Sequence, residues 1–238
     1  MHAISFQDVS YEVTQKKILS QITGHFTKGR ITTLVGPSGA GKTTLLKLCN
    51  GLLTPTTGQI HILNRAYEEY SPPDLRTTVG IALQAAPMIR GTVYDNLALP
   101  LTLKKQTLPP QKAAHYLEAV GLSKDICQQD ARDLSGGQRQ RVSIARTLIN
   151  EPAILLLDEI TSALDQAAAD SIEKLIMQLN QQHDVTVIWI THNLEQALRV
   201  SDEVWVMIDG KLIQQGTPAI LKQPTHQQVQ QFTEGALR

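Results

Sequence analysis

The chain of 238 residues lacks an excess of charge of either sign, because its 22 Lys and Arg residues balance its 22 Asp and Glu residues. General nucleic-acid-binding proteins usually carry a basic excess, so we expect no nucleic-acid partner. Intrinsically disordered chains combine a large net charge with few apolar residues, whereas 42% of this sequence is hydrophobic. The composition therefore predicts a globular protein with a substantial buried core.

Long apolar runs are also missing from the sequence. The apolar stretches at 153–157 and 185–190 are far shorter than the ~20 residues that a membrane-spanning helix needs. Residues 1–10 have neither a basic start nor an apolar stretch, so they do not resemble a signal peptide. The two cysteines, Cys49 and Cys127, lack the spacing of a metal or redox motif, which favours reduced and buried thiols. We expect a soluble, cytoplasmic protein.

Three apolar runs predict the centre of the fold. Runs that are apolar on both faces indicate buried parallel strands, which we expect at Ile31–Val35, Ala153–Leu157 and Thr186–Ile190. Each run is followed by a helical pattern, and the alternation of strand and helix is typical of an α/β fold. Polar residues follow all three runs, at the sheet edge where open α/β folds bind their ligands.

The two ends of the chain predict antiparallel sheet. Residues alternate between apolar and polar at Ser5–Val13, and Gly58–Leu63 is a second short strand candidate. Near the C-terminus, Asp209-Gly210 separates the strand candidates Glu203–Ile208 and Lys211–Gln214. Asp-Gly between two such runs favours a hairpin with a type I′ turn, which needs positive φ at both central positions.

The middle of the chain, residues 87–148, differs from both of these parts. It contains helical patterns such as Gln111–Val120 and few strand signals. We therefore expect one domain over residues 1–238, in which residues 1–86 and 149–238 form the core. Residues 87–148 would form a helical subdomain inserted between two strands of that core.

A glycine-rich segment lies between the first predicted strand and the helical run Thr44–Cys49, and it matches the pattern G-x-x-x-x-G-K-[ST]. Glycines let such a loop point its backbone N–H groups at phosphate oxygens, while the following helix presents its positive end. Lys42 adds a positive charge for the β- and γ-phosphates, and the Thr43 hydroxyl can coordinate Mg²⁺. The segment predicts a nucleoside triphosphate site formed by Gly36, Pro37, Ser38, Gly39, Ala40, Gly41, Lys42, Thr43 and Thr44.

Two acidic residues follow the second predicted strand, and a histidine follows the third. A carboxylate beside a phosphate loop can hold Mg²⁺, which predicts a metal-binding role for Asp158. A second carboxylate one residue later, Glu159, can orient or deprotonate an attacking water. His192 follows the third strand at the same edge, although by its position alone it is as often structural as functional.

A second glycine-rich loop lies in the middle region and also opens a helical pattern. It consists of Leu134, Ser135, Gly136, Gly137 and Gln138. A helix N-terminus of this kind can bind an anion, although Ser-Gly-Gly can equally be a plain helix cap. One chain cannot easily bring both glycine-rich loops onto one phosphate, which suggests that a second copy of the protein takes part.

Together these residues resemble the ATP-binding-cassette (ABC) family, and the resemblance covers nearly the whole chain. Gly36–Thr43 is similar to the family's Walker A loop, Leu134–Gln138 to its signature motif and Ile154–Asp158 to its Walker B strand. Glu159 stands where the family has its catalytic glutamate, and His192 where it has its switch histidine.

Three further positions extend the resemblance. Gln84 is similar to the Q-loop glutamine, and Ser162–Asp165 to the D-loop with its Asp165. Tyr11 stands where the family has an aromatic residue that stacks on adenine, the alternative being a core or edge-strand tyrosine. The resemblance implies an α/β P-loop NTPase core of mixed or parallel sheet, with an N-terminal antiparallel β subdomain and an inserted α-helical subdomain.

The resemblance also implies a mechanism in which two copies pack head to tail around two ATP molecules. The Walker A loop of one copy would face Ser135-Gly-Gly of the other. Glu159 would polarise the attacking water, and His192 would contact the γ-phosphate. Mg²⁺ would be held by Thr43, Gln84 and Asp158. ATP would join the two copies, and its hydrolysis would let them separate.

Within the family, the ATPase subunit of a membrane transporter is favoured. The chain would then need a separate integral membrane permease, which region 85–97 would contact, and would lie on the inner face of the cell membrane. One alternative is a cassette ATPase without a membrane role, which usually has two cassettes or a long coiled-coil insertion. The other alternative, a different P-loop NTPase, is nearly eliminated by the signature motif.

The transported substrate is indicated only by local similarity. Pro87–Leu97 and Asp158–Asp165 resemble a small two-component group that includes bacterial iron exporters and a plant transporter tied to aluminium tolerance. Ile160 stands where most cassettes have proline, and the bacterial iron exporter shares this departure. We therefore expect metal export. The alternative is an importer of phosphate or polar amino acids, in which a solute-binding protein would be a further partner.

Overall fold

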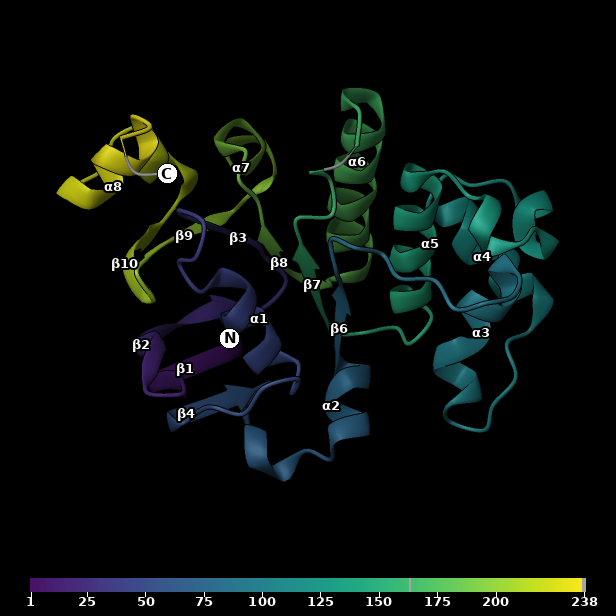
Figure 1. Cartoon of the computed structure of the whole chain (residues 1–238), viewed down its shortest axis with the longest axis horizontal. Coiled ribbons are helices and arrows are strands. Elements are labelled where there is room, and N and C mark those ends of the chain that lie inside the picture. Colours follow the sequence, from purple (N-terminus) through teal and green to yellow (C-terminus); the bar gives the residue numbers. More distant parts are fainter. Residues whose placement is uncertain (163, 237–238) are drawn as a thin grey trace.

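The computed structural model describes residues 1–162 and 164–236, which form two sheets with helices around them (Figure 1). The strands of the larger sheet are β3 (Ile31–Val35), β6 (Val79–Ala82), β7 (Ile154–Asp158), β8 (Thr186–Ile190), β9 (Glu203–Ile208) and β10 (Lys211–Gly216). Their order is β10-β9-β3-β8-β7-β6. Neighbouring strands are parallel except β9 and β10, which form a hairpin.

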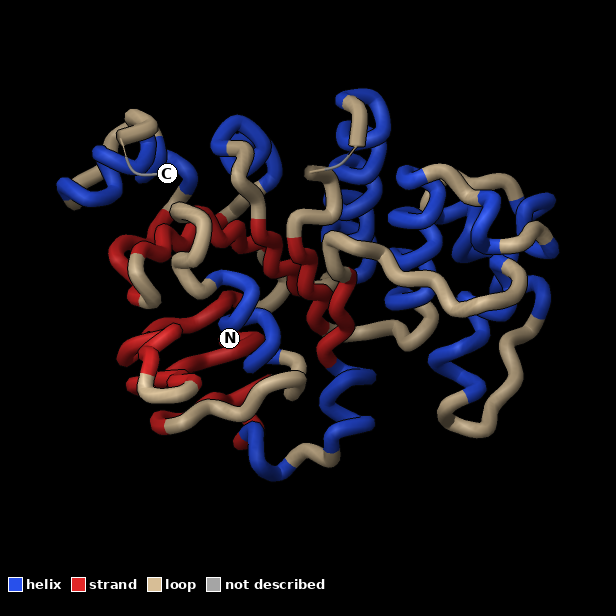
Figure 2. Tube along the Cα trace, in the orientation of Figure 1, coloured by secondary structure: helices blue, strands red, loops and turns tan. Residues whose placement is uncertain are grey.

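The smaller sheet is antiparallel, and its order is β2-β1-β4-β5. Its strands are β1 (His2–Val13), β2 (Lys16–Thr27), β4 (Thr57–Ile62) and β5 (Arg65–Ala66). The helix α1 (Lys42–Cys49) lies between the two sheets (Figure 2). Apolar side chains from both sheets and from α1 form one continuous core there.

The larger sheet is buried on both faces, because successive side chains of a strand point to opposite sides. On β7, Ile154 and Leu156 belong to the core shared with α1 and the smaller sheet. Leu155 and Leu157 belong to a second core on the other face. A strand covered on both faces has few polar residues, which explains the unbroken apolar runs in the sequence.

Further helices flank the strands of the two sheets. They are α2 (Pro72–Thr78), α6 (Gln166–His183), α7 (Leu194–Val200) and α8 (Gln227–Thr233), with the short 3₁₀ helices η1 (Tyr67–Glu69) and η4 (Pro218–Leu221). Of these, α6 and α7 contribute to the second core, whereas α2 and η1 pack into the first. In the described residues, no helix combines the length and the apolar character needed to cross a membrane.

Residues 87–148 form a group of helices beyond β6 and β7 (Figure 1). The group contains α3 (Val93–Thr102), α4 (Pro110–Ala119), α5 (Gly136–Leu148) and the 3₁₀ helices η2 (Lys124–Gln128) and η3 (Ala131–Asp133). No strand lies in this segment, all of which is described. Its apolar side chains continue directly into the second core of the sheet. The division of the chain into core and subdomain stays a prediction.

The expected fold class is confirmed: an α/β core with parallel strands, antiparallel strands at its N-terminal end and inserted helices. Asp209 (φ 49°) and Gly210 (φ 73°) both have the positive φ that a type I′ turn requires. Several boundaries shift by one to three residues: for example, α1 already begins at Lys42, β1 begins at His2, and β7 runs from Ile154 to Asp158.

The two cysteines differ in exposure. Among the described residues both are free thiols, and Cys49 is buried whereas Cys127 is partly exposed. Burial raises the pKa of both thiols. The expectation of buried thiols is therefore correct for Cys49 and only partly correct for Cys127.

Candidate nucleotide-binding site

The first glycine-rich loop connects β3 to α1 at the carboxyl edge of the larger sheet. Gly36 begins the loop with a φ of 147°, and a Cβ at this position would lie 1.9 Å from the carbonyl oxygen of Met207 on β9. Only glycine therefore fits where the loop leaves the sheet. The β9–β10 turn also holds the loop, because the N–H of Gly210 donates to the carbonyl of Ala40 at 3.2 Å.

Lys42, the first residue of α1, is only 5% exposed. Its Nζ donates to the carbonyl oxygens of Gly36 at 2.7 Å and Pro37 at 2.8 Å. Burial lowers the pKa of Lys42, and the negative charges of Glu159 and Asp158 oppose that shift. The ammonium group is thus fixed against the loop and beside the positive end of α1, which suits the binding of phosphate.

Asp158 ends β7 and accepts a hydrogen bond from the hydroxyl of Thr43 at 3.1 Å. Burial raises the pKa of this carboxyl, and the Thr43 hydrogen bond lowers it. The charge of Glu159 raises the same pKa, whereas the charges of Lys47 and Lys42 lower it. A hydroxyl and a carboxylate oxygen therefore lie together at the end of the loop.

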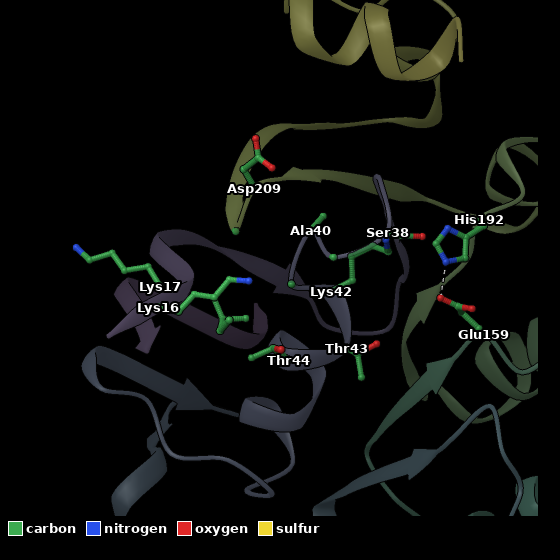
Figure 3. A pocket seen from close by; sticks show the side chains of 14 residues that line it. Lys16, Lys17, Ser38, Ala40, Lys42, Thr43, Thr44, Glu159, His192 and Asp209 are labelled. Atoms are coloured by element: carbon green, nitrogen blue, oxygen red, sulfur yellow. Dashed lines mark ion pairs between the residues drawn. The ribbon is translucent and has the colours of Figure 1, made fainter. Parts of the chain in front are cut away.

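Glu159 and His192 lie side by side, with Oε1 of the glutamate 2.5 Å from Nε2 of the histidine (Figure 3). They follow neighbouring strands, β7 and β8, at the same sheet edge. Glu159 has a φ of 50°, which is uncommon for a residue with a side chain, and its N–H donates to the carbonyl of Ile190 at 3.2 Å. The backbone thus turns sharply where the carboxylate meets the imidazole.

Gln84 reaches the same group through Ser162. Nε2 of Gln84 donates to the Ser162 hydroxyl at 3.1 Å, and that hydroxyl donates to the carbonyl oxygen of Glu159 at 2.9 Å. Gln84 follows β6, so three adjacent strands supply the residues of this edge. Ser162 was not singled out as a separate site residue in the sequence, because a serine in a turn has no distinctive pattern.

A cavity of about 600 Å³ lies over the glycine-rich loop, within the ~300–1,000 Å³ typical of small-molecule sites (Figure 3). Residues 38–44 line it together with Glu159 and His192, so the loop and the candidate catalytic pair share one space. The cavity is also lined by Lys16, Lys17, Ile18, Asp209 and Gly210. Two lysines beside a hairpin turn are too common in sequences to predict a site, and only the folding of β2 against the loop brings them here.

Tyr11 is partly buried on β1 and packs against the core between the two sheets. It is not among the residues that line the cavity, and its role in adenine stacking stays a prediction. Asp165 accepts a hydrogen bond from the N–H of Ala168 at 2.8 Å and so caps α6. Of the D-loop segment, residue 163 lies outside the described part of the chain.

The second glycine-rich loop begins α5. Ser135 caps this helix by accepting from the N–H of Gln138 at 3.2 Å, and the Gln138 side chain accepts from the N–H of Ser135 at 2.9 Å. Ser135 and Gly136 are exposed, and neither they nor Gly137 line the cavity. Within one chain, the structure therefore does not bring the two glycine-rich loops together.

Comparison with other proteins agrees with this site. The family profile described as ABC transporter matches residues 19–162. The chain is 43% identical over 242 positions to a Bacillus subtilis (strain 168) protein named as the putative ABC transporter ATP-binding protein YjkB. That match covers 99% of this chain and 96% of the relative. It is 34% identical over 218 positions to ABC transporter I family member 17 of Arabidopsis thaliana, covering 92% and 83%. It is also 38% identical to a Bacteroides thetaiotaomicron protein named as spermidine/putrescine import ATP-binding protein PotA, covering 96% of this chain and 50% of that one.

Solved structures of ABC transporter ATP-binding domains also resemble this chain. The ATP-binding cassette MJ0796, in a dimeric post-hydrolysis state with ADP and Pi, superposes with a TM-score of 0.81 at 28% identity, covering 90% of this chain and 98% of that one. CbiO1 of Clostridium perfringens, part of the ABC transporter complex CbiONQ, superposes with a TM-score of 0.82 at 28% identity, covering 94% and 91%. The chain belongs to the ABC transporter family and is one of its ATP-binding, ATP-hydrolysing subunits.

Proposed function

We propose that two copies of the chain bind MgATP between them and couple its hydrolysis to transport through a separate integral membrane permease. The main support is the shared cavity, where the buried Lys42 and the Glu159–His192 pair lie around one glycine-rich loop. In this proposal the chain lies on the cytoplasmic face of the cell membrane, held there by the permease.

The loop and Lys42 would bind the phosphates. The backbone N–H groups of residues 38–44 and the start of α1 provide partial positive charge at the cavity. In the described structure the Lys42 ammonium donates to the carbonyls of Gly36 and Pro37. When nucleotide binds, it would donate to the β- and γ-phosphate oxygens instead. Lys16 and Lys17 add further positive charge to the same cavity.

Glu159 would act on the attacking water. Its carboxylate would accept a proton from the water as the water oxygen attacks the γ-phosphorus and the bond to the bridging oxygen breaks, giving ADP and phosphate. His192 contacts this carboxylate through Nε2, so it can hold the carboxylate in place and reach the γ-phosphate at the same edge.

The residues beside the loop fit Mg²⁺. This ion prefers oxygen ligands, and the Thr43 hydroxyl and the Asp158 carboxylate supply two oxygen donors 3.1 Å apart. Thr43, Gln84 and Asp158 would hold the ion. When bound, it would neutralise charge on the β- and γ-phosphates.

A second copy would complete each site. Ser135, Gly136 and Gly137 form an exposed helix start that lies outside the cavity of their own chain. The same groups can therefore contact a nucleotide held by a partner chain. The dimeric state of MJ0796 with ADP and Pi supports this arrangement.

The test of this mechanism is Glu159→Gln. We expect ATP turnover to be lost, because an amide cannot accept the proton. MgATP should still bind at the loop, and the ATP-bound dimer should accumulate. Steady-state phosphate release and size-exclusion chromatography with ATP measure the two effects. Lys42→Ala is the matched control, since it should lose both nucleotide binding and the dimer. Normal turnover by Glu159→Gln would overturn the assignment of the base.

For the cargo, we propose metal export, with iron as the first candidate. Its support is the similarity of Pro87–Leu97 and Ile160 to iron exporters. The PotA relative, named as an import protein, supports the alternative of import, in which a solute-binding protein would also take part. Deletion of this chain should raise cellular iron measured by elemental analysis, and Glu159→Gln should fail to restore it. Reduced uptake of phosphate or an amino acid, at normal iron, would favour the importer.

A further inference from the structure

Glu173, on α6, is a buried carboxylate without a role in the mechanism above. Its side chain is 9% exposed, and Arg199 of α7 donates to it from Nη2 at 3.0 and 3.1 Å and from Nε at 3.3 Å. Gln196, also on α7, donates from Nε2 to the same carboxylate at 2.8 Å. A buried carboxylate is tolerated only with such partners, so this cluster ties α6 firmly to α7.

The cluster continues from Gln196 to the loop that carries Glu159. Nε2 of Gln196 also donates to the hydroxyl of Thr161 at 3.0 Å. Gln196 is itself only 3% exposed, and its N–H donates to Asn193, the residue that caps α7. Thr161 lies two residues after Glu159, and Asn193 lies directly after His192. The buried amide therefore links the two segments that supply the candidate catalytic pair.

Only part of the contact between these two segments is apolar packing, because Ile160 is buried in the second core while the polar residues beside it line a cavity. The cavity, of about 380 Å³, lies between the segments and is lined by Glu159, Thr161, Ser162, Thr191, His192, Asn193, Gln196 and Glu173, among others. Across this space, the side chains of the two segments are held by hydrogen bonds. Besides the backbone bond from the Glu159 N–H to the Ile190 carbonyl, these are the Glu159–His192 contact and the bond from Gln196 to Thr161, and Gln196 also donates to Glu173.

We propose that Glu173 is a positioning residue for ATP hydrolysis: through Gln196 it holds the Glu159–Thr161 loop against α7 and so sets the Glu159–His192 geometry. This inference rests on the proposed roles of Glu159 and His192. Glu173 does not touch the nucleotide loop, so it acts on the chemical step and not on the binding of ATP. A displacement of about 1 Å at a reacting group can cost on the order of 100-fold in rate.

The test compares variants of the full chain by ATP turnover against ATP concentration, with thermal unfolding alongside. Glu173→Ala should lower kcat about tenfold or more and leave KM for ATP within about twofold. Glu173→Gln should recover most of the turnover, because its amide oxygen can still accept from Gln196. Thr161→Val should lower kcat similarly while the Glu173–Arg199 pair and the fold stay intact. Should Glu173→Ala fail to fold, Thr161→Val decides.

The control is Glu151→Ala, which removes the 2.7 Å ion pair between Glu151 and Lys112 of α4 and should leave turnover unchanged. The inference is overturned if the folded Glu173→Ala and Thr161→Val variants keep kcat within about twofold of the parent, or if KM rises instead. An active Glu159→Gln variant would instead refute the proposed base. A dead Glu159→Gln beside a fully active Glu173→Ala would refute the positioning role alone.

Discussion

At the scale of single residues, Asp158 shows a conflict between burial and charge. Burial raises the pKa of its carboxyl above the ordinary 3.8, despite the hydrogen bond from Thr43 and the nearby lysines. At pH values between the pKa of Asp158 in the unfolded chain and its higher pKa in the folded chain, the folded chain keeps the carboxyl proton more often than the unfolded chain does. The folded state therefore loses stability as the pH rises through that interval, and the full cost is present at neutral pH.

Asp158→Asn should raise Tm near neutral pH, because the amide is not ionised and its oxygen can still accept from Thr43. As the pH is lowered through the folded-state pKa toward 3.8, the advantage should shrink, since the native carboxyl then becomes neutral as well. Thermal unfolding of both proteins over a pH series measures this. A difference in Tm that stays constant across the series would contradict the explanation by burial.

Two glycines of the same loop provide a matched pair. Gly36→Ala would place a Cβ 1.9 Å from a backbone carbonyl of the central strand β9, which cannot move away, whereas a Cβ at Gly39 meets no described atom within 4 Å. We expect Gly36→Ala to lower the free energy of unfolding by at least about 3 kcal/mol. Gly39→Ala should cost only about 1–2 kcal/mol, for its positive φ. Urea unfolding measures both values, and equal losses would refute the contact with Met207.

The residues of the site that belong to sequence motifs could be predicted, but the other residues that line the cavity could not. Lys42, Thr43 and Asp158 belong to patterns whose spacing is set by the chemistry of phosphate and Mg²⁺. Lys17 and Asp209 have no such pattern: they line the nucleotide cavity because β2 and the β9–β10 turn pack beside the loop. Long-range packing of this kind leaves no periodic trace in one sequence.

At the scale of elements, helix starts show how one motif can serve structure and function together. Ser135 begins α5 and Thr92 begins α3, and each makes the same reciprocal capping box. In both, a hydroxyl accepts from the backbone three residues later and that residue's side chain accepts from the cap. The two caps therefore contribute similarly to stability, whatever else either does.

Replacement of each cap by alanine separates the two roles. Ser135→Ala and Thr92→Ala should each lower the free energy of unfolding by about 1 kcal/mol. Only Ser135→Ala should also lower ATP turnover, since the proposed site places Ser135, and not Thr92, against the partner's nucleotide. Chemical unfolding and phosphate release measure the two effects. An equal loss of turnover in both variants would show that helix stability alone is responsible.

The elements differ in how well the sequence predicts them. The strands β3, β7 and β8 are buried at every position and appear as short runs rich in apolar and β-branched residues. β6 has only four residues, and β2 mixes polar with apolar residues along a strand paired chiefly with β1, so neither was expected. Tertiary contacts, rather than local pattern, make these segments regular.

At the scale of the whole molecule, the helical region shares its core with the sheet. One apolar cluster includes Leu97, Leu117 and Ile144 of the helices together with Leu157 and Trp189 of the sheet. A domain that folds alone would need a core of its own. The chain should therefore unfold as one cooperative unit, even though Figure 1 shows the helices as a separate group.

Two optical probes can check this. Both tryptophans lie in the larger sheet, Trp189 in the core shared with the helices and Trp205 in the core shared with α1, so their fluorescence reports on the sheet and its packing. Far-ultraviolet circular dichroism reports mainly on the helices. We expect the two signals to change at the same urea concentration. A helical signal that is lost first, with fluorescence unchanged, would show that residues 87–148 unfold separately.

The exposed start of α5 has a consequence for how the enzyme behaves when dilute. In the proposed dimer each site needs Ser135 of a partner chain, so a single chain should be inactive and encounters between chains should limit the reaction. In dilute solution, velocity should then grow with the square of the chain concentration. Once a permease anchors two copies side by side, velocity should become proportional to concentration, and idle chains in the cell would not waste ATP.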